Sequence, residues 1–367
     1  MNRIDNITVS ILKADLIQPF RTALGSHDCL ENLLVKLELS DGTKGCGEAA
    51  VATHITGETI QGTKNNLKKA AEKLIGRDGS DYLKISAELN ERLPHNKCAV
   101  AAIECALMDA LTRQWKIPLW KLFGARPVKL VSDITIVIAD LAETEKAVSR
   151  FYRRGFRTFK VKIGRDFDLD IKRVASVKRL TRGSKIILDA NQGYSGDQTL
   201  KFIKELKKIK VRPALIEQPV PKKDWEGLKR VARSCGIPVC ADESVGDFKE
   251  ALRAVKEKAV PVINIKLMKS GLIEAHKIAL LAKANGIKLM IGGMMESSLA
   301  MTASAHLASG LGCFDFIDLD TPFFIKDGLK RNSYLNSKGV YDLKKVKAGI
   351  GISIKNVKCE FGINKVG

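Results

Sequence analysis

Seven short apolar runs in this chain each end in a polar or charged cluster, and the cluster positions recur at nearly constant spacing. The seven positions are Lys162, Asp189, Glu217, Asp242, Lys266, Gly292 and Asp318. Successive members lie 27, 28, 25, 24, 26 and 26 residues apart. Since about 250 residues make eight strand–helix units in a (β/α)8 barrel, this step matches one unit. A solvated loop start would explain one or two of these residues, but an ordered series predicts the mouth of a parallel barrel.

The strand and helix patterns extend this prediction from residue 130 to residue 320. An apolar run at 130–138 precedes the series, which gives eight strands. Helical periodicity between the runs predicts seven helices, at about 142–154, 167–182, 197–210, 225–234, 247–257, 272–286 and 298–309. We therefore expect an α/β fold with a (β/α)7β barrel.

The remaining segments do not follow the barrel rhythm. Strand-like alternation near residues 7–12, 32–39 and 43–49 includes a strong turn signal at Asp41-Gly42, and helical patterns follow at 59–75, 82–92 and 97–114. This order predicts an α+β capping domain. We expect domains at 1–125 (cap) and 126–325 (barrel), with residues 326–367 returning to pack on the cap.

Composition narrows the class of protein. The chain has 367 residues with 45% hydrophobic and 28% charged content, as in globular enzymes. We expect no signal peptide and no membrane span, because no basic-then-apolar leader and no apolar run near 18 residues occurs. The eight cysteines are scattered without a C-x-x-C pair or metal spacing, which favours a reducing, cytoplasmic location.

The net charge of +21 raises the alternative of a protein that binds RNA or an anionic surface. The lysines are spread along predicted helix faces, however, and aromatic content is only 6%. No block combines basic and aromatic residues as a nucleic-acid platform would. A lysine-rich solvated surface is the preferred interpretation, with neither a nucleic acid nor a membrane as partner.

Three carboxylates end consecutive predicted strands: Asp189, Glu217 and Asp242. Oxygen ligands without Cys or His suit a hard cation, and Mg²⁺ accepts a few carboxylates while leaving positions for water and substrate. Helix capping is the competing explanation; it fits Asp242 tolerably and Asp189 poorly. We therefore predict one Mg²⁺ per active site.

Lysines stand on both sides of this triad in the strand order. Lys162 and Lys266 end strands two and six, which lie across the barrel mouth from each other, so they suit proton transfer on two faces of one carbon. To act as a base, a lysine needs a pKa well below the usual value of about 10.4. Burial, the cation and Lys160 on the same strand face all favour this shift.

With these residues in place, the chain resembles the muconate-cycloisomerase subgroup of the enolase superfamily over essentially its full length. The motifs are Lys160-Val161-Lys162, Asp189-Ala190-Asn191, Glu217-Gln218-Pro219, Asp242-Glu243-Ser244 and Asn264-Ile265-Lys266-Leu267-Met268-Lys269. The resemblance implies Mg²⁺ on the carboxylate triad, joined by a substrate carboxylate, and an enediolate formed when a lysine removes the α-proton. It also implies a homo-oligomer.

The last barrel strand favours one activity within that subgroup. Asp318-Leu319-Asp320 resembles the Asp-x-Asp feature of dipeptide epimerases, and residues i and i+2 of a strand share a face. Two carboxylates would attract a substrate ammonium and repel substrates with additional carboxylates. The prediction is an epimerase that inverts the second residue of an L,L-dipeptide. An N-acylamino acid racemase, a cycloisomerase and an o-succinylbenzoate synthase remain alternatives on the same scaffold.

The resemblance also implies substrate contacts. Lys160 would bind the substrate carboxylate, and Thr135 and Gly293 would touch the substrate. Specificity would come from two loops of the cap, around Gly25 and around Ile55. Relatives that act on Ala-Glu carry an arginine where Gly25 stands, so we expect an uncharged or hydrophobic second residue, unless Arg21 or another cation replaces that arginine.

Overall fold

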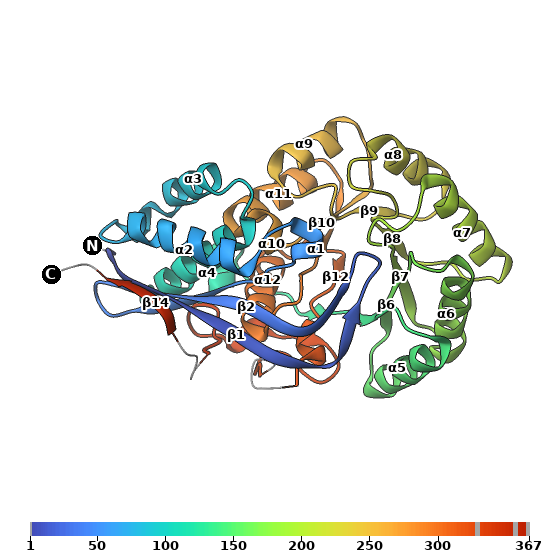
Figure 1. Cartoon of the computed structure of the whole chain (residues 1–367), viewed down its shortest axis with the longest axis horizontal. Helices are drawn as coiled ribbons and strands as arrows, with labels where there is room; N and C mark the ends of the chain where they lie inside the picture. Colours follow the sequence, from blue (N-terminus) through green and yellow to red (C-terminus); the bar gives the residue numbers. More distant parts are fainter. Residues whose placement is uncertain (1, 327–330, 355–358, 365–367) are drawn as a thin grey trace.

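The computed structural model of the chain describes residues 2–326, 331–354 and 359–364, which form two main sheets and their covering helices (Figure 1). The first sheet is antiparallel, with strand order β14-β1-β2-β3. Its strands are β1 (Ile4–Arg21), β2 (Ser26–Leu39), β3 (Lys44–Ala49) and β14 (Cys359–Asn364). The predicted turn joins β2 to β3: Gly42 has a φ of 82°, and its N–H donates to the carbonyl of Leu39 at 2.8 Å. A positive φ at this position explains the glycine.

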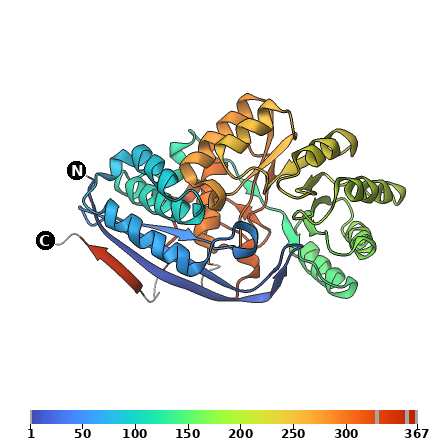
Figure 2. The ribbon, with the colours of Figure 1, turned by 45° about the horizontal axis from the view of Figure 1, so that its top comes forward.

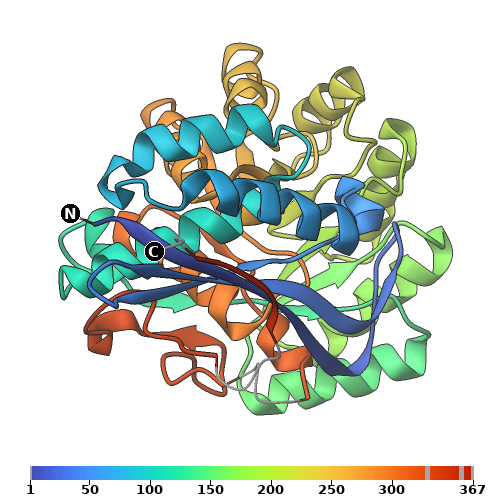
Figure 3. The ribbon, with the colours of Figure 1, turned by 60° about the vertical axis from the view of Figure 1, so that its left-hand side comes forward.

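Three helices cover this sheet, as Figure 3 shows from the side. They are α2 (Ile60–Leu74), α3 (Tyr82–Arg92) and α4 (Lys97–Gln114), at the predicted positions, and a short α1 (Thr53–Thr56) precedes them. Helix α4 lies directly on β3, because a Cβ atom at Gly45 or Gly47 would overlap the carbonyl oxygens of Ala106 or Ala102. Glycine at alternate positions of the strand thus permits the close approach of the helix.

The second sheet is parallel and has eight strands in the order β12-β11-β10-β9-β8-β7-β6-β5. The strands are β5 (Ile134–Ile136), β6 (Thr158–Lys162), β7 (Lys185–Asp189), β8 (Leu215–Glu217), β9 (Val239–Ala241), β10 (Val262–Ile265), β11 (Lys288–Ile291) and β12 (Phe316–Ile317). The sheet curls on itself, and the N–H of Asp133 donates to the carbonyl of Ile317 at 2.8 Å across the seam between β5 and β12. This architecture confirms the predicted α/β barrel with a cap.

Helices alternate with these strands and surround the barrel (Figures 1 and 2). They are α5 (Leu141–Arg154), α6 (Phe167–Leu180), α7 (Gly196–Lys208), α8 (Trp225–Ser234), α9 (Phe248–Lys256), α10 (Leu267–Ser270), α11 (Leu272–Ala284) and α12 (Ser298–Leu311). The seven long helices fall where the sequence predicted them. The short α10 was not predicted, since one helical turn carries too little periodicity to be recognised.

The first barrel strand differs from its prediction. The run 130–138 splits into β4 (Leu130–Val131) and β5, because β4 pairs with β13 (Val340–Tyr341) in a separate antiparallel pair. Between β4 and β5, the N–H of Ser132 donates to the carbonyl of Gly339 at 2.9 Å. The chain therefore leaves one pairing and joins the barrel within two residues.

The C-terminal segment meets both parts of the molecule. Strand β14 pairs antiparallel with β1 and lies beside the N-terminal segment (Figure 2). Further upstream, the N–H of Ile350 donates at 2.6 Å to Asp109 on α4. The domain limits near residues 125 and 325 remain predictions, and residues 327–330, 355–358 and 365–367 of the predicted return lie outside the described residues. Within the described part of the chain, no helix combines the length and apolarity needed to cross a membrane.

Candidate active site

The seven cluster positions of the sequence all lie at the C-terminal ends of barrel strands. Lys162, Asp189 and Glu217 are the last residues of β6, β7 and β8. Asp242, Lys266, Gly292 and Asp318 directly follow β9, β10, β11 and β12. Because the strands are parallel, these ends meet at one mouth of the barrel. The structure therefore brings the predicted catalytic and metal residues into one ring.

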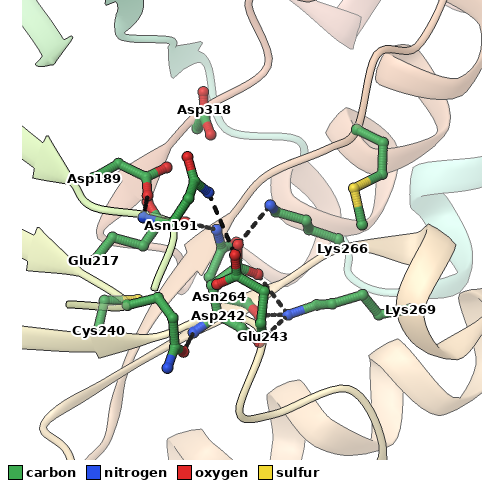
Figure 4. Close-up of polar contacts among 12 residues, drawn as sticks. Asp189, Asn191, Glu217, Cys240, Asp242, Glu243, Asn264, Lys266, Lys269 and Asp318 are labelled. Atoms are coloured by element: carbon green, nitrogen blue, oxygen red, sulfur yellow. Dashed lines mark hydrogen bonds and ion pairs between the residues drawn. The ribbon is translucent and has the colours of Figure 1, made fainter. Parts of the chain in front are cut away.

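The three predicted metal ligands are buried side by side (Figure 4). Asp189, Glu217 and Asp242 all have 0% exposure. In the strand register Asp189 pairs with Glu217, and Glu217 pairs with the residue two before Asp242. Burial and, to a smaller extent, the nearby carboxylate of Asp189 raise the pKa of Glu217 to about 8. Three buried carboxylates that repel one another offer oxygen ligands of the kind that a hard cation such as Mg²⁺ binds.

Lys162 and Lys266 approach the triad from different strands. Nζ of Lys162 donates to Asp189 Oδ2 at 2.6 Å and to Asn191 Oδ1 at 3.0 Å. Nζ of Lys266 donates to Asp242 Oδ2 at 2.6 Å. Both lysines are buried, and both also line the cavity at the barrel mouth. A substrate in that cavity would therefore meet both lysines.

The pKa of Lys266 differs from the expectation. Burial lowers it, but the carboxylates of Asp242 and Glu217 outweigh burial and raise it above the usual value for lysine. The same contact acts in reverse on Asp242: burial raises its pKa, and Lys266 and Lys269 lower it to below the usual range. At Lys266 these carboxylates therefore oppose the lowered pKa that the sequence predicted, because the prediction treated them only as metal ligands.

Lys160 has more partners than the sequence suggested. Its Nζ lies 3.0 Å from Asp189 Oδ2, 2.8 Å from Glu217 Oε2 and 2.6 Å from Asp318 Oδ2. Its side chain is 1% exposed. Lys160 thus connects the metal-type carboxylates to the Asp-x-Asp pair and holds Asp318 in place.

Asp318 and Asp320 line the same cavity, as predicted, but not by strand alternation, because both residues follow the end of β12 at Ile317. Oδ2 of Asp320 accepts a hydrogen bond from the N–H of Thr135 at 2.5 Å. Burial and, to a smaller extent, the carboxylate of Asp318 raise the pKa of Asp320 to about 7. The pair forms an anionic wall on which a substrate ammonium could bind.

The cavity at the mouth has a volume of about 40 Å³ and is lined by most of the predicted substrate residues. These lining residues include Thr135, Gly293, Asp318, Asp320 and Ile55. A Cβ atom at Gly293 would press on Glu296 and Met301, so the glycine leaves the cavity open. Gly25 lies next to a residue of the cavity lining. A Cβ atom at this position would be 3.1 Å from the ring of His54, which lines the cavity.

The cap contributes mainly apolar and uncharged groups to this cavity. Phe20 and Ile55 come from the cap, and the methionines 294, 295 and 301 come from the barrel. Burial lowers the pKa of His27 to about 4, so this lining histidine is neutral at neutral pH. Arg21 lies outside, 3.9 Å from Glu143, and lines another cavity. Among the described lining residues, none is an arginine.

Several residues that hold the site were not assigned from the sequence. Gln218 Oε1 accepts from the N–H groups of Asp242 (2.9 Å) and Ser244 (3.1 Å), which joins the ends of β8 and β9. Asn264 Nδ2 donates to Glu217 Oε1 at 2.8 Å, and Lys269 Nζ donates to Asp242 Oδ1 at 2.7 Å. All three residues sit inside the motifs noted above, one to three positions from an assigned residue, which is the signal that could have found them.

One missed residue carried no such signal. Asp133 lies before β5, yet one oxygen each of Asp133, Asp318 and Asp320 lies within 4.8 Å of the others. Both Asp133 oxygens are buried, and neither has a hydrogen-bond partner among the described residues. Only the closure of the barrel brings this residue to Asp318.

Two family models match the chain in sequence. The model described as enolase C-terminal domain-like matches residues 143–358, and the mandelate racemase/muconate lactonizing enzyme N-terminal domain matches residues 6–124. The chain belongs to the enolase superfamily. The family resemblance inferred from the motifs is thereby confirmed.

Similar members of the superfamily have names that refer to dipeptides. A hydrophobic dipeptide epimerase of Citrifermentans bemidjiense is 46% identical, over 95% of this chain and 97% of that protein. An aromatic dipeptide epimerase of Herpetosiphon aurantiacus is 37% identical, over 96% of this chain and 99% of that protein. A crystal structure of a dipeptide epimerase of Enterococcus faecalis, complexed with Mg and L-Leu-L-Tyr, has a TM-score of 0.90 and 33% identity, covering 96% of this chain and 100% of that one.

Proposed function

We propose that this enolase-superfamily member is a Mg²⁺-dependent dipeptide epimerase. It would invert the α-carbon of the second residue of an L,L-dipeptide by a 1,1-proton transfer. The observation that carries the proposal is one cavity with two lysines beside a carboxylate triad and an aspartate pair at its wall. Relatives named for this activity support it over most of the chain length.

Proton transfer falls to the two lysines. For one epimer, Nζ of Lys162 or Lys266 takes the α-proton from the carbon, and the electron pair moves toward the carboxylate. The other lysine then delivers a proton to the opposite face. General acid–base catalysis of this kind requires each lysine within hydrogen-bond reach of the same carbon, one on each side. Both lysines line the same cavity, Lys162 from the end of β6 and Lys266 from directly after β10, which supports this assignment. A bound Mg²⁺ would compensate the carboxylate charges that raise the pKa of Lys266 and so favour the neutral amine that a base requires.

Asp189, Glu217 and Asp242 would hold the Mg²⁺ ion. When bound, the ion supplies positive charge that stabilises the negative charge developing on the substrate carboxylate. Gln218 and Asn264 would keep Asp242 and Glu217 in their orientations through the hydrogen bonds described above.

Asp318 and Asp320 would bind the free N-terminal ammonium of the dipeptide. The family resemblance assigns Lys160 to the substrate carboxylate, whereas in this structure its Nζ is paired with Asp189, Glu217 and Asp318. Thr135 and Gly293 would contact the substrate backbone. This arrangement disfavours an N-acylated substrate, which has no ammonium, and substrates with extra carboxylates. In an N-acylamino acid racemase, replacing the two aspartates by asparagine would matter little.

The cavity lining favours an uncharged or hydrophobic second residue. Its cap-derived wall is formed by Phe20 and Ile55 with neutral His27 nearby, and Arg21 points to another cavity. An acidic side chain would be desolvated there without a dedicated cation, which is unfavourable. A homo-oligomer in solution is also proposed, on the family resemblance alone.

Deuterium uptake tests the function. The protein with Mg²⁺ is incubated in D₂O with pooled L,L-dipeptides, and mass spectrometry detects a one-unit gain at the second α-carbon. Uptake by hydrophobic members, abolished by chelation and restored by Mg²⁺, is expected. A metal-bound protein that labels no dipeptide, but labels N-acylamino acids, would overturn the proposal.

A further inference from the structure

Asp133 is a buried acid at the seam of the barrel with no role in the reaction described above. Its N–H is fixed by the carbonyl of Ile317 at 2.8 Å, and the residue is 1% exposed. Its carboxyl group approaches Asp318 and Asp320, with one oxygen of each of the three within 4.8 Å of the others. The backbone therefore holds the buried carboxyl group of Asp133 next to two carboxyl groups that line the cavity at the barrel mouth.

The three groups differ in their partners. Asp318 accepts from Lys160 at 2.6 Å, and Asp320 accepts from the N–H of Thr135 at 2.5 Å. Asp133 accepts from no donor among the described residues. As an anion, Asp133 would be a buried charge without a partner beside two other carboxylates, which is a costly state.

The other charged groups near Asp133 do not relieve this cost. The charge of Lys160 acts on Asp133, but its Nζ is already engaged by Asp189, Glu217 and Asp318. On its other side, Asp133 borders a cavity of about 360 Å³ at the opposite end of the barrel. The charged residues of that cavity are Lys129, Lys185 and Asp315, all of them exposed.

A proton on Asp133 removes the conflict. A protonated carboxyl group gains one O–H donor, and a neighbouring carboxylate is the strongest available acceptor for it. Burial and the charges of Asp318 and Asp320 raise the pKa of Asp133 well above its usual value, in agreement with this state. The remaining acidic groups at the wall are then Asp318, which is paired with Lys160, and Asp320, which has no lysine partner among the described residues.

We propose that Asp133 is a positioning residue that stays protonated and donates a hydrogen bond to the Asp318–Asp320 pair, fixing that pair for the substrate ammonium. The assignment rests on the proposed function for its substrate. Asp133 touches neither the substrate nor the reacting carbon and acts through the two aspartates. Asp133 thus supports the Asp318–Asp320 wall as a neutral hydrogen-bond donor.

Two substitutions separate a neutral donor from an anion. Asp133→Asn keeps a donor of similar shape, whereas Asp133→Leu keeps the volume and removes the donor; both retain the backbone N–H. Because D133L removes a hydrogen bond to a charged group, it should raise KM for a dipeptide by about tenfold or more, with a smaller effect on kcat. D133N, which keeps a donor, should have a KM close to that of the wild type. Asp318→Asn, which removes a binding anion, should have a strongly raised KM. A KM in D133N as high as in D318N would overturn the proposal, because Asp133 would then be a binding anion.

An infrared measurement tests the protonation state without any substrate. The difference spectrum between wild-type protein and D133N should contain the C=O stretching band of a carboxylic acid, and this band should shift in D₂O. A carboxylate band in its place would overturn the proposal. Because this readout needs no turnover, it remains decisive if the protein labels no dipeptide, which would count against the proposed function alone.

A titration with Mg²⁺ tests whether the three carboxyl groups bind a metal ion instead of sharing a proton. Binding of Mg²⁺ at equilibrium should have the same stoichiometry in wild-type protein and D133N. Loss of one bound equivalent in D133N would overturn the proposal and make Asp133 a metal ligand. Circular dichroism and thermal unfolding of each variant confirm that the KM values come from folded protein.

Discussion

The ammonium nitrogen of Lys266 lies 2.6 Å from Oδ2 of Asp242. Lys162 has the same relationship to Asp189, also at 2.6 Å. Each proposed base is thus bound to a proposed metal ligand on the adjacent strand, β10 to β9 and β6 to β7. The two lysines approach the triad from its two ends, and this arrangement makes the roles of the two lysines separable by experiment.

Replacing Lys162 or Lys266 by alanine should reduce epimerisation by about 10²–10⁴-fold, because one of the two proton-transfer groups is lost. The remaining lysine can still remove and return a proton on its own face. Each single variant should therefore exchange the α-hydrogen of one epimer with D₂O without inverting it. NMR of the L,L- and L,D-dipeptides, incubated separately, measures both exchange and inversion.

The matched control is Lys172→Ala, at an exposed lysine of α6. It should leave both exchange and inversion unchanged. If K162A and K266A retained exchange of the same epimer, the two lysines would not act on opposite faces, and the two-lysine assignment would fail.

Gln218 connects two proposed metal ligands and offers a test of the metal site. Its Oε1 holds the N–H of Asp242, and its backbone has a φ of 32°, directly after Glu217. Residues that orient metal ligands typically contribute about 10–100-fold in metal affinity. We expect Gln218→Leu to weaken Mg²⁺ binding in that range, as measured by calorimetric titration.

Gln61→Ala is the control for this change, since Gln61 is an exposed glutamine on α2. It should bind Mg²⁺ as the wild type does. Unchanged Mg²⁺ affinity in folded Q218L would show that the hydrogen bonds of Gln218 do not orient Asp242 for the metal.

Gly25 allows a test of substrate preference. Its φ is not in the left-handed region, so an L-residue is permitted, although a Cβ would press on His54 at 3.1 Å. Gly25→Arg would place a guanidinium near the cavity wall. Since hydrogen bonds to charged groups contribute about 1.5–3 kcal/mol, we expect kcat/KM for L-Ala-L-Glu to rise by about tenfold relative to L-Ala-L-Leu.

Gly25→Ala introduces the same steric contact with His54 but no charge, and it should leave the ratio of the two kcat/KM values near that of the wild type. An equal change of the ratio in G25A and G25R would attribute the effect to displacement of His54. In that case position 25 would not set the preference through charge.

The barrel and its charged ring could be predicted because the end of each strand has a local signal in the sequence. An apolar run followed by Asp189 or Glu217 is a local signal, and parallel topology then gathers all such ends at one mouth. The long helices could be predicted for the same reason, since their apolar periodicity is also a local signal. The short α10 was not foreseen because one helical turn carries too little periodicity. The split between β4 and β5 was not foreseen because it depends on the pairing of β4 with the distant β13.

The charge state of the site could not be predicted in the same way. The sequence gives Lys266 and Asp242 as separate members of the series, but the direction of the lysine pKa depends on their 2.6 Å contact. Asp133 is the clearest case. It is an ordinary aspartate before a strand, and its position beside Asp318 follows only from closure of the barrel 185 residues later in the chain.

His306 provides a prediction for stability that is independent of the metal site. It is buried on α12; Nδ1 accepts from the N–H of Trp120 at 2.9 Å, and Nε2 donates to the carbonyl of Ile350 at 3.0 Å. The ring is therefore neutral in the folded protein, and burial lowers its pKa to about 4. A lowered pKa stabilises the folded state above the unfolded value of about 6.5, and this contribution is lost as the pH falls toward 4.

Between about pH 7.5 and about pH 5, this linkage amounts to about 2 kcal/mol of unfolding free energy. Urea unfolding at both pH values measures it as the difference between wild-type protein and His306→Gln, which removes the titration and cancels the contribution of every other group. The pH-dependent loss should be about 2 kcal/mol smaller in H306Q. His95→Gln, at an exposed histidine, is the matched control. The same pH dependence in wild-type protein and folded H306Q would mean that protonation of His306 does not cause the loss of stability at low pH.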